Sequence, residues 1–180
     1  MGTFELLPHP ANPPLGVSKV EARITAIDAH WMTLRWRVEG AQALVLPSFA
    51  GRGRADELWQ TTCFELFVKP AGGGGYAEFN FSPSQQWAAY DFSAYRDGMA
   101  ERAMPRAPVC TPRRGQSVLI FDVALPFAAL PSLPFDFGLT AVIEEEGGRK
   151  SYWAIAHRED RPDFHHEACF GSHLAAPSAL

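Results

Sequence analysis

Two glutamates and an asparagine interrupt aromatic-rich runs near the middle of this 180-residue chain. Glu65 lies in CFELFV, and Glu78 and Asn80 lie in YAEFNF. Two carboxylates about 5–9 Å apart can hydrolyse a glycosidic bond, and neighbouring strands can hold them at such a distance. Aromatic rings among hydrogen-bonding groups also suit an amphipathic ligand such as a sugar. Two other interpretations of these polar residues remain. They could belong to a solvated outer face of the sheet. Glu65 could instead be a buried structural carboxylate, which would need a partner. The candidate partners are Arg35, Arg37 and His157.

Three of the five tryptophans stand next to polar positions and are candidates for lining a groove. Trp36, by contrast, alternates with apolar residues and is expected in the core. A tryptophan ring can stack on the apolar face of a sugar while neighbouring carboxylates and amides bind its hydroxyls. The sequence therefore predicts a ligand-binding set. Its members are Trp59, Glu65, Asn80, Trp87, Trp153 and His157.

A second polar cluster, DFHHEAC, runs from Asp163 to Cys169. Its imidazoles, carboxylates and thiol are ligands that Zn²⁺ or Cu²⁺ accepts, and His157, His165 and His166 form the candidate metal set. Adjacent residues of an extended chain point to opposite faces, however, and the spacing matches no zinc-binding motif. We expect a structural loop whose polar side chains bond to backbone, with the metal site as the alternative.

Nucleophilic catalysis finds little support. Cys63, Cys110 and Cys169 lack a catalytic sequence context, and the motif Gly-x-Ser-x-Gly is absent. We therefore expect a protein that is not an enzyme.

The central stretch reads as three consecutive strands, residues 61–69, 76–82 and 87–92. Glycines 72–75 end the first strand, and Ser82-Pro83-Ser84 ends the second. Side chains alternate between the two faces of a strand, so these strands should offer one apolar face to a core. We expect the other face to carry Glu65, Glu78, Asn80, Asp91 and Trp87.

The remaining chain shows the same period of two between frequent turn signals. Further strands are expected over residues 17–27, 31–38, 43–46, 109–113, 117–124, 135–144 and 151–157. Roughly nine or ten short strands without a strong helical pattern predict an all-β fold, an antiparallel β-sandwich of jelly-roll or Ig-like type in two sheets. Residues 1–16 contain four prolines and are expected to be an extended, irregular lead-in. Residues 17–173 form the single expected domain, and 174–180 a flexible tail.

Composition excludes several classes of partner. The formal net charge is −4 and basic residues do not cluster, so no nucleic-acid partner is expected. No apolar run reaches the length of a membrane span, and the N-terminus lacks the pattern of a secretory signal. Three widely spaced cysteines fit reduced thiols. Together these features predict a cytoplasmic protein.

Three segments resemble a known family. ELWQTTCFELFV, YAEFNFSPSQQWAAYDFSAYRDGM and SYWAIAHREDRPDFHH are similar to the DOMON-like domains related to family 9 carbohydrate-binding modules, and most closely to their stand-alone bacterial branch. The resemblance covers most of residues 17–170. It implies a β-sandwich that binds a ligand, because relatives bind either saccharides or haem b.

Carried over to this chain, the saccharide-binding relatives imply Trp59 and Trp153 as stacking platforms. Glu65, Asn80 and His157 are the implied hydrogen-bonding groups. The haem-binding relatives use one methionine and one histidine as axial ligands. Nothing in the spacing of the methionines and histidines here singles out such a pair, and no Cys-x-x-Cys-His motif is present.

The expected function is therefore a non-catalytic module that binds a saccharide or a sugar-containing small molecule, without a cofactor. The alternatives are a haem b or metal domain associated with redox chemistry, and a scaffold for a protein partner.

Overall fold

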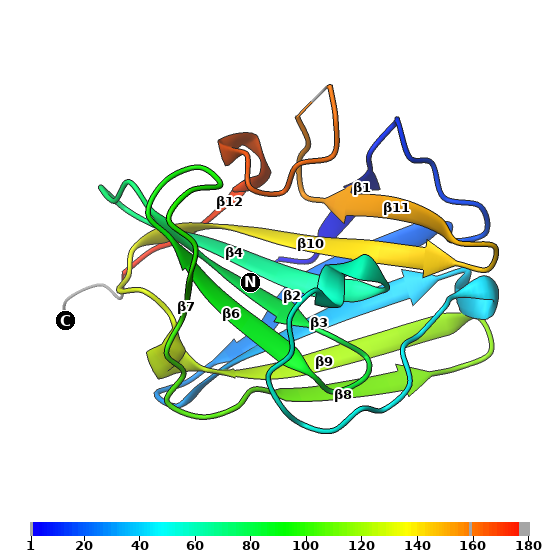
Figure 1. The fold of residues 1–180 in the computed structure, drawn as a ribbon, viewed down its shortest axis with the longest axis horizontal. Coiled ribbons are helices and arrows are strands. Elements are labelled where there is room, and N and C mark those ends of the chain that lie inside the picture. The colour runs from blue at the N-terminus through cyan, green and yellow to red at the C-terminus, as the bar shows by residue number, and fades with distance from the viewer. Residues whose placement is uncertain (1, 159, 177–180) are drawn as a thin grey trace.

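The computed structural model describes residues 2–158 and 160–176, and in these the chain is all-β and antiparallel (Figure 1). Its regular elements are twelve strands and four short 3₁₀ turns, with no α-helix among the residues described. The strands are β1 (Phe4–Pro8), β2 (Lys19–Ile27), β3 (Trp31–Glu39), β4 (Cys63–Pro70), β5 (Tyr76–Phe81), β6 (Trp87–Phe92), β7 (Ala100–Glu101), β8 (Val109–Arg114), β9 (Val118–Pro126), β10 (Phe135–Glu145), β11 (Arg149–Ala154) and β12 (Ser172–Leu174).

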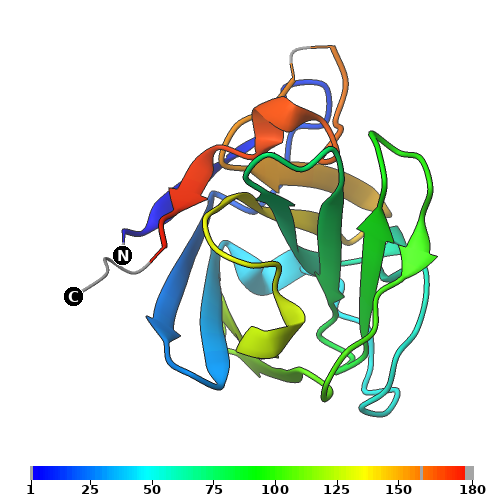
Figure 2. The ribbon, with the colours of Figure 1, turned by 90° about the vertical axis from the view of Figure 1, so that its left-hand side faces the viewer.

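The strands form one continuous, strongly curled sheet in the order β7-β6-β5-β4-β10-β11-β1-β2-β3-β9-β8, with β12 beside β10. Figure 2 shows how the two ends of this path curl toward each other. The all-β antiparallel prediction is confirmed. The expected division into two separate sheets is not confirmed. β1 pairs with β2 on one side and with β11 on the other, and so joins the two halves into one sheet.

The N-terminal prediction needs the same correction. Residues 4–8 are a paired strand rather than an irregular lead-in, because Leu6 is buried in the core and anchors the segment despite the prolines around it. The prediction of a strand over residues 43–46 is also wrong. Ala41–Ala43 is a 3₁₀ turn, and Leu44 makes a single β-bridge to Glu145. Most of the predicted tail, 177–180, lies outside the described residues.

The core fills the space inside the curled sheet. Trp36 is completely buried at its centre, with ring centroids 5.5 Å from Phe64 and 6.3 Å from both Phe81 and Phe121. These residues face inward from β3, β4, β5 and β9, as their alternation predicts. The opposite face of β4, β5, β6, β10 and β11 points away from this core, and we call it the outer face. No helix in the part of the chain that the structure describes is long and apolar enough to cross a membrane.

Candidate ligand-binding site

The outer face carries a row of polar side chains at its middle. Glu65 on β4 lies directly opposite Asn80 on β5 and Thr140 on β10. The row ends in Ala88 on β6 and Ala154 on β11. Cross-strand partners share a face of the sheet, so this row crosses five strands on one side. The alanines at its ends keep bulky side chains off the polar centre.

Glu78 lies on the same face as this row, because it is two residues before Asn80 on β5 and residues two apart on a strand share a face. Asn80 Nδ2 donates to Glu78 Oε1 at 2.7 Å, and Thr140 Oγ1 donates to Glu65 Oε2 at 3.1 Å. Asn80 Oδ1 is buried and has no hydrogen-bond partner among the residues described. We call Glu65, Glu78, Asn80 and Thr140 the polar floor; each is at most 6% exposed.

The two carboxyl groups of the polar floor hold protons more tightly than usual. Burial, and then the proximity of Glu78, raise the pKa of Glu65 well above its ordinary range. Burial also raises the pKa of Glu78 to about 7, although the hydrogen bond from Asn80 and the charge of Arg96 act against it. Within residues 2–158 and 160–176, no lysine or arginine forms an ion pair with either carboxylate. The expected partners of Glu65 lie elsewhere: Arg35 pairs with Asp122, and Arg37 with Glu39.

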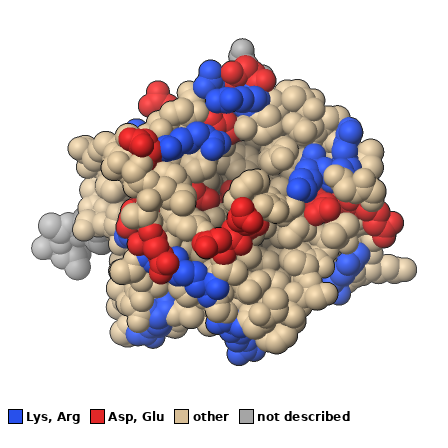
Figure 3. Space-filling model, viewed as in Figure 1, with Lys and Arg blue, Asp and Glu red and all other residues tan. Residues whose placement is uncertain are grey.

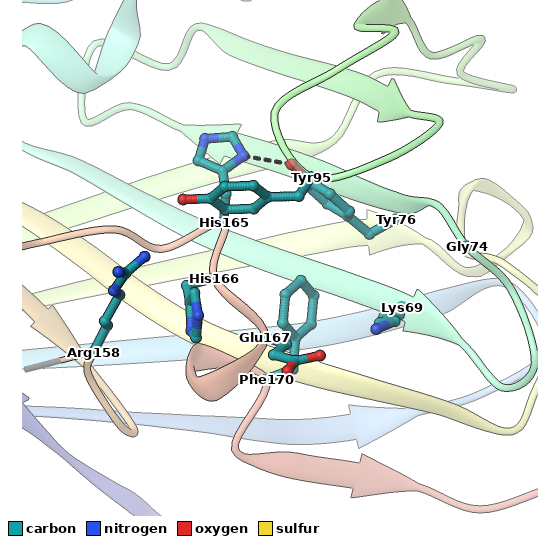
Figure 4. A pocket seen from close by; sticks show the side chains of 9 residues that line it. All are labelled: Lys69, Gly74, Tyr76, Tyr95, Arg158, His165, His166, Glu167 and Phe170. Carbon is teal, nitrogen blue, oxygen red and sulfur yellow. Dashed lines mark hydrogen bonds between the residues drawn. The ribbon is translucent and has the colours of Figure 1, made fainter.

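One wall of the site is the segment after β11, which crosses the outer face. His165 comes from this segment, and its Nδ1 is hydrogen-bonded to the Tyr76 hydroxyl at 2.7 Å (Figure 4). Its Nε2 lies 3.8 Å from Glu78 Oε2. Burial, and then the charge of Arg96, lower the pKa of His165 to about 4. The imidazole is therefore neutral near pH 7 and supplies no positive charge to Glu78.

An ion pair between a half-exposed arginine and a buried aspartate fixes this wall. Arg96 Nη2 lies 2.8 Å from the Asp163 carboxylate, which also accepts a hydrogen bond from the Tyr95 hydroxyl. Burial raises the pKa of Asp163, but the hydrogen bonds from Tyr95 and Arg96 outweigh it and hold the pKa below its usual value. The segment also needs Gly138 beneath it, since a Cβ there would lie 2.4 Å from the Cys169 carbonyl oxygen.

The opposite wall is the 3₁₀ turn η2 (Leu58–Gln60). Leu58 packs against Cys63 and Ala88 at the edge of the outer face, while the next residue, Trp59, is 52% exposed. The preceding Asp56 accepts a hydrogen bond from Tyr90, whose register partner is Glu78. Figure 3 shows this side of the molecule hollowed near its centre, with acidic side chains in and around the hollow. The turn that carries this exposed indole thus borders the outer face at Cys63 and Ala88, and Ala88 is the register partner of Asn80 in the polar floor.

A separate groove of about 280 Å³ lies on the far side of His165 (Figure 4). Its lining residues are Lys69, Gly74, Tyr76, Tyr95, Arg158, His165, His166, Glu167 and Phe170. His165 lines this groove and also lies 3.8 Å from Glu78 of the polar floor.

Three residues of the expected set do not reach this site. Trp87 pairs with Phe81 on the core side of the sheet, where its ring lies under the Arg54 guanidinium. Trp153 is 2% exposed, sits in the core and donates from Nε1 to Ser151 Oγ at 2.8 Å. The expectation that these two tryptophans line a groove is corrected, because both are buried.

His157 likewise lies apart, beside the C-terminal end of β1. Its Nε2 is hydrogen-bonded to the Leu7 carbonyl oxygen at 2.7 Å, and its ring packs against His9. Nor does it gather with His165 and His166 into a metal site: the described residues contain no group of three or more His, Cys, Asp or Glu side chains that could hold a metal ion. His166 instead caps the 3₁₀ turn η4 (Glu167–Cys169) by accepting a hydrogen bond from the Ala168 N–H.

Sequence reasoning missed other parts of the site. Thr140 lies in an ordinary apolar strand, and the sequence places His165 only in the candidate metal set. For the site as a whole, the sequence offers one signal, the alternation in YAEFNF. It places Tyr76, Glu78 and Asn80 on one face of a strand.

Comparison with known proteins adds a likeness of fold. No family model matches the chain, and no curated protein matches it. Among solved structures, it is similar to a Bacteroides uniformis protein that has been proposed to bind carbohydrate, with a TM-score of 0.64, 17% identity, and coverage of 92% of this chain and 84% of that one. It is also similar to a family 9 carbohydrate-binding module from Caldicellulosiruptor kristjanssonii in complex with glucose, with a TM-score of 0.52, 10% identity, and coverage of 98% and 87%. The resemblance to these modules is thus confirmed at the level of the fold.

Proposed function

We propose that the protein is a non-catalytic module that binds a small saccharide on its outer face, between Trp59 and His165. The observation that carries the proposal is the exposed Trp59 in a turn that packs on the same outer face as the buried polar floor. A pyranose has an apolar face that can stack on an indole and a rim of hydroxyls that hydrogen-bond to carboxylates and amides. The likeness of fold to a module in complex with glucose supports the same class of ligand.

The arrangement favours binding over hydrolysis. Glycosidases place their two carboxyl groups on either side of the scissile bond. Glu65 and Glu78 instead lie next to each other on one floor, one directly opposite Asn80 and the other hydrogen-bonded to it. Both would meet the same side of a bound sugar. The single exposed tryptophan among the three candidates fits a ligand of one or two sugar rings.

Trp59→Ala is expected to weaken saccharide binding at least tenfold, because it removes the stacking surface. The measurement is calorimetric titration with glucose and cellobiose, beginning with the unmodified protein. The free energy of unfolding should change by no more than about 0.5 kcal/mol, since the side chain is half exposed.

Val109→Ala is the matched control. Val109 is 50% exposed, close to the 52% of Trp59, but lies on β8 at the other end of the sheet. Saccharide affinity that falls equally in both variants, or in neither, would contradict the proposal.

A further inference from the structure

The polar floor has more hydrogen-bond acceptors than donors. The hydrogen bonds among the described residues use one oxygen of each carboxylate, Glu65 Oε2 and Glu78 Oε1. No side-chain hydrogen bond among the described residues reaches the second oxygen of either carboxylate, although His165 Nε2 lies 3.8 Å from Glu78 Oε2, and Asn80 Oδ1 is buried without a partner there. Asn80 is the register partner of Glu65 and is bonded to Glu78, so these three acceptors lie within one neighbourhood of the sheet.

The charges around the floor are also unbalanced. His165 is neutral near pH 7, and Arg96 is engaged by Asp163. Tyr76, Tyr90 and Cys63 are the other titratable groups beside the two glutamates, and none of them carries a positive charge. On the rim, Asp56 adds a further negative charge at the Tyr90 hydroxyl. Among the described residues, therefore, no lysine or arginine is paired with either carboxylate of the polar floor, and the nearby Arg96 is paired with Asp163.

We propose that the saccharide held here is an amino sugar whose ammonium group lies over Glu78, Glu65 and Asn80. This inference rests on the proposed function and names the class of sugar. An ammonium group has three N–H donors and a positive charge, which match the three neighbouring acceptors and the negative charge that Glu78 gains above its pKa of about 7. A neutral hydroxyl supplies one donor and no charge. The proposal also gives Asn80 Oδ1 a partner, which a buried polar atom normally has.

The test is calorimetric titration at pH 6 and pH 8 with four probes: glucose, N-acetylglucosamine, 2-amino-2-deoxyglucose and 6-amino-6-deoxyglucose. At least one amino sugar should bind tenfold or more tightly than glucose at pH 8. N-acetylglucosamine should show no such advantage, because acetylation removes the charge. The affinity for 6-amino-6-deoxyglucose, whose alkylamine stays protonated over this range, should fall at pH 6 as Glu78 takes up a proton.

Two amide variants and a control complete the test. Glu78→Gln and Glu65→Gln should each reduce the advantage of the amino sugar over glucose at least tenfold. Glu146→Gln, the same change at an exposed position in the β10–β11 turn, should keep it. If glucose binds as tightly as both amino sugars at both pH values, the inference is overturned while saccharide binding stands. If none of the four probes binds, the proposed function fails and the inference fails with it.

Discussion

Glu78→Gln is expected to increase the free energy of unfolding by about 3 kcal/mol at pH 8 and to leave it almost unchanged at pH 4.5. Glu78 is 6% exposed, and its pKa rises from 4.5 in the unfolded chain to about 7 in the folded protein. Between these values the folded state binds more protons than the unfolded state, so stability falls as pH rises. A difference of about 2.5 units corresponds to about 3 kcal/mol. Glutamine stays neutral, and its amide oxygen can still accept from Asn80.

His165 has the opposite effect in the same range of pH. Its folded pKa, about 4, lies below the ordinary value of 6.5, so it reduces stability as pH falls through 6.5. The two effects offset each other in the unmodified protein. The informative quantity is therefore the difference between Glu78→Gln and the unmodified protein, measured by urea unfolding from pH 4.5 to 8. Glu146→Gln is the control, and a difference for Glu78→Gln that does not grow with pH would refute the account.

Glu145→Ala is expected to lower the free energy of unfolding by about 3–5 kcal/mol. The Glu145 carboxylate is 1% exposed and accepts three backbone hydrogen bonds, from Leu15 at 2.7 Å, Gly16 at 2.6 Å and Val17 at 3.0 Å. It thereby fixes the chain between β1 and β2 against β10. Alanine would leave these donors without a partner, and Val17 is itself buried.

Urea unfolding and amide hydrogen exchange measure this effect. The amides of Leu15, Gly16 and Val17 should lose protection more than those of the core strands. Glu146→Ala, one residue along the chain and exposed, should change stability by less than about 0.5 kcal/mol. If Glu145→Ala costs no more than this control, the carboxylate does not anchor the segment.

Alternation within a strand was sufficient to predict much of the fold. It correctly separated Phe64 and Leu66 from Glu65, and Phe79 from Glu78 and Asn80, because side chains on a strand point to opposite faces. Alternation does not fix the phase between strands. Alternation alone predicts Trp87 on the same face as Glu65, but the turn between β5 and β6 brings it opposite Phe81 on the core side. A shift of one residue moves every side chain to the other face, and the register depends on the turn.

The rest of the site depends on contacts between distant parts of the chain. Thr140 reaches Glu65 from 75 positions away, and His165 reaches Tyr76 from 89. No local pattern encodes either contact. Trp153 shows the converse: polar positions around it predict a place in a groove, whereas the hydrogen bond from its indole to Ser151 satisfies it inside the core.

The most direct test of saccharide binding on the outer face is a ¹⁵N–¹H NMR titration with glucose and 6-amino-6-deoxyglucose. The account predicts saturable shifts of the Trp59 indole N–H and the Asn80 side-chain amide, together with backbone amides of β4 and β5 near Glu65 and Glu78. Signals from β2, β3, β8 and β9 should stay in place. Shifts confined to those four strands, or no shift of the Trp59 and Asn80 side chains with either sugar, would contradict it.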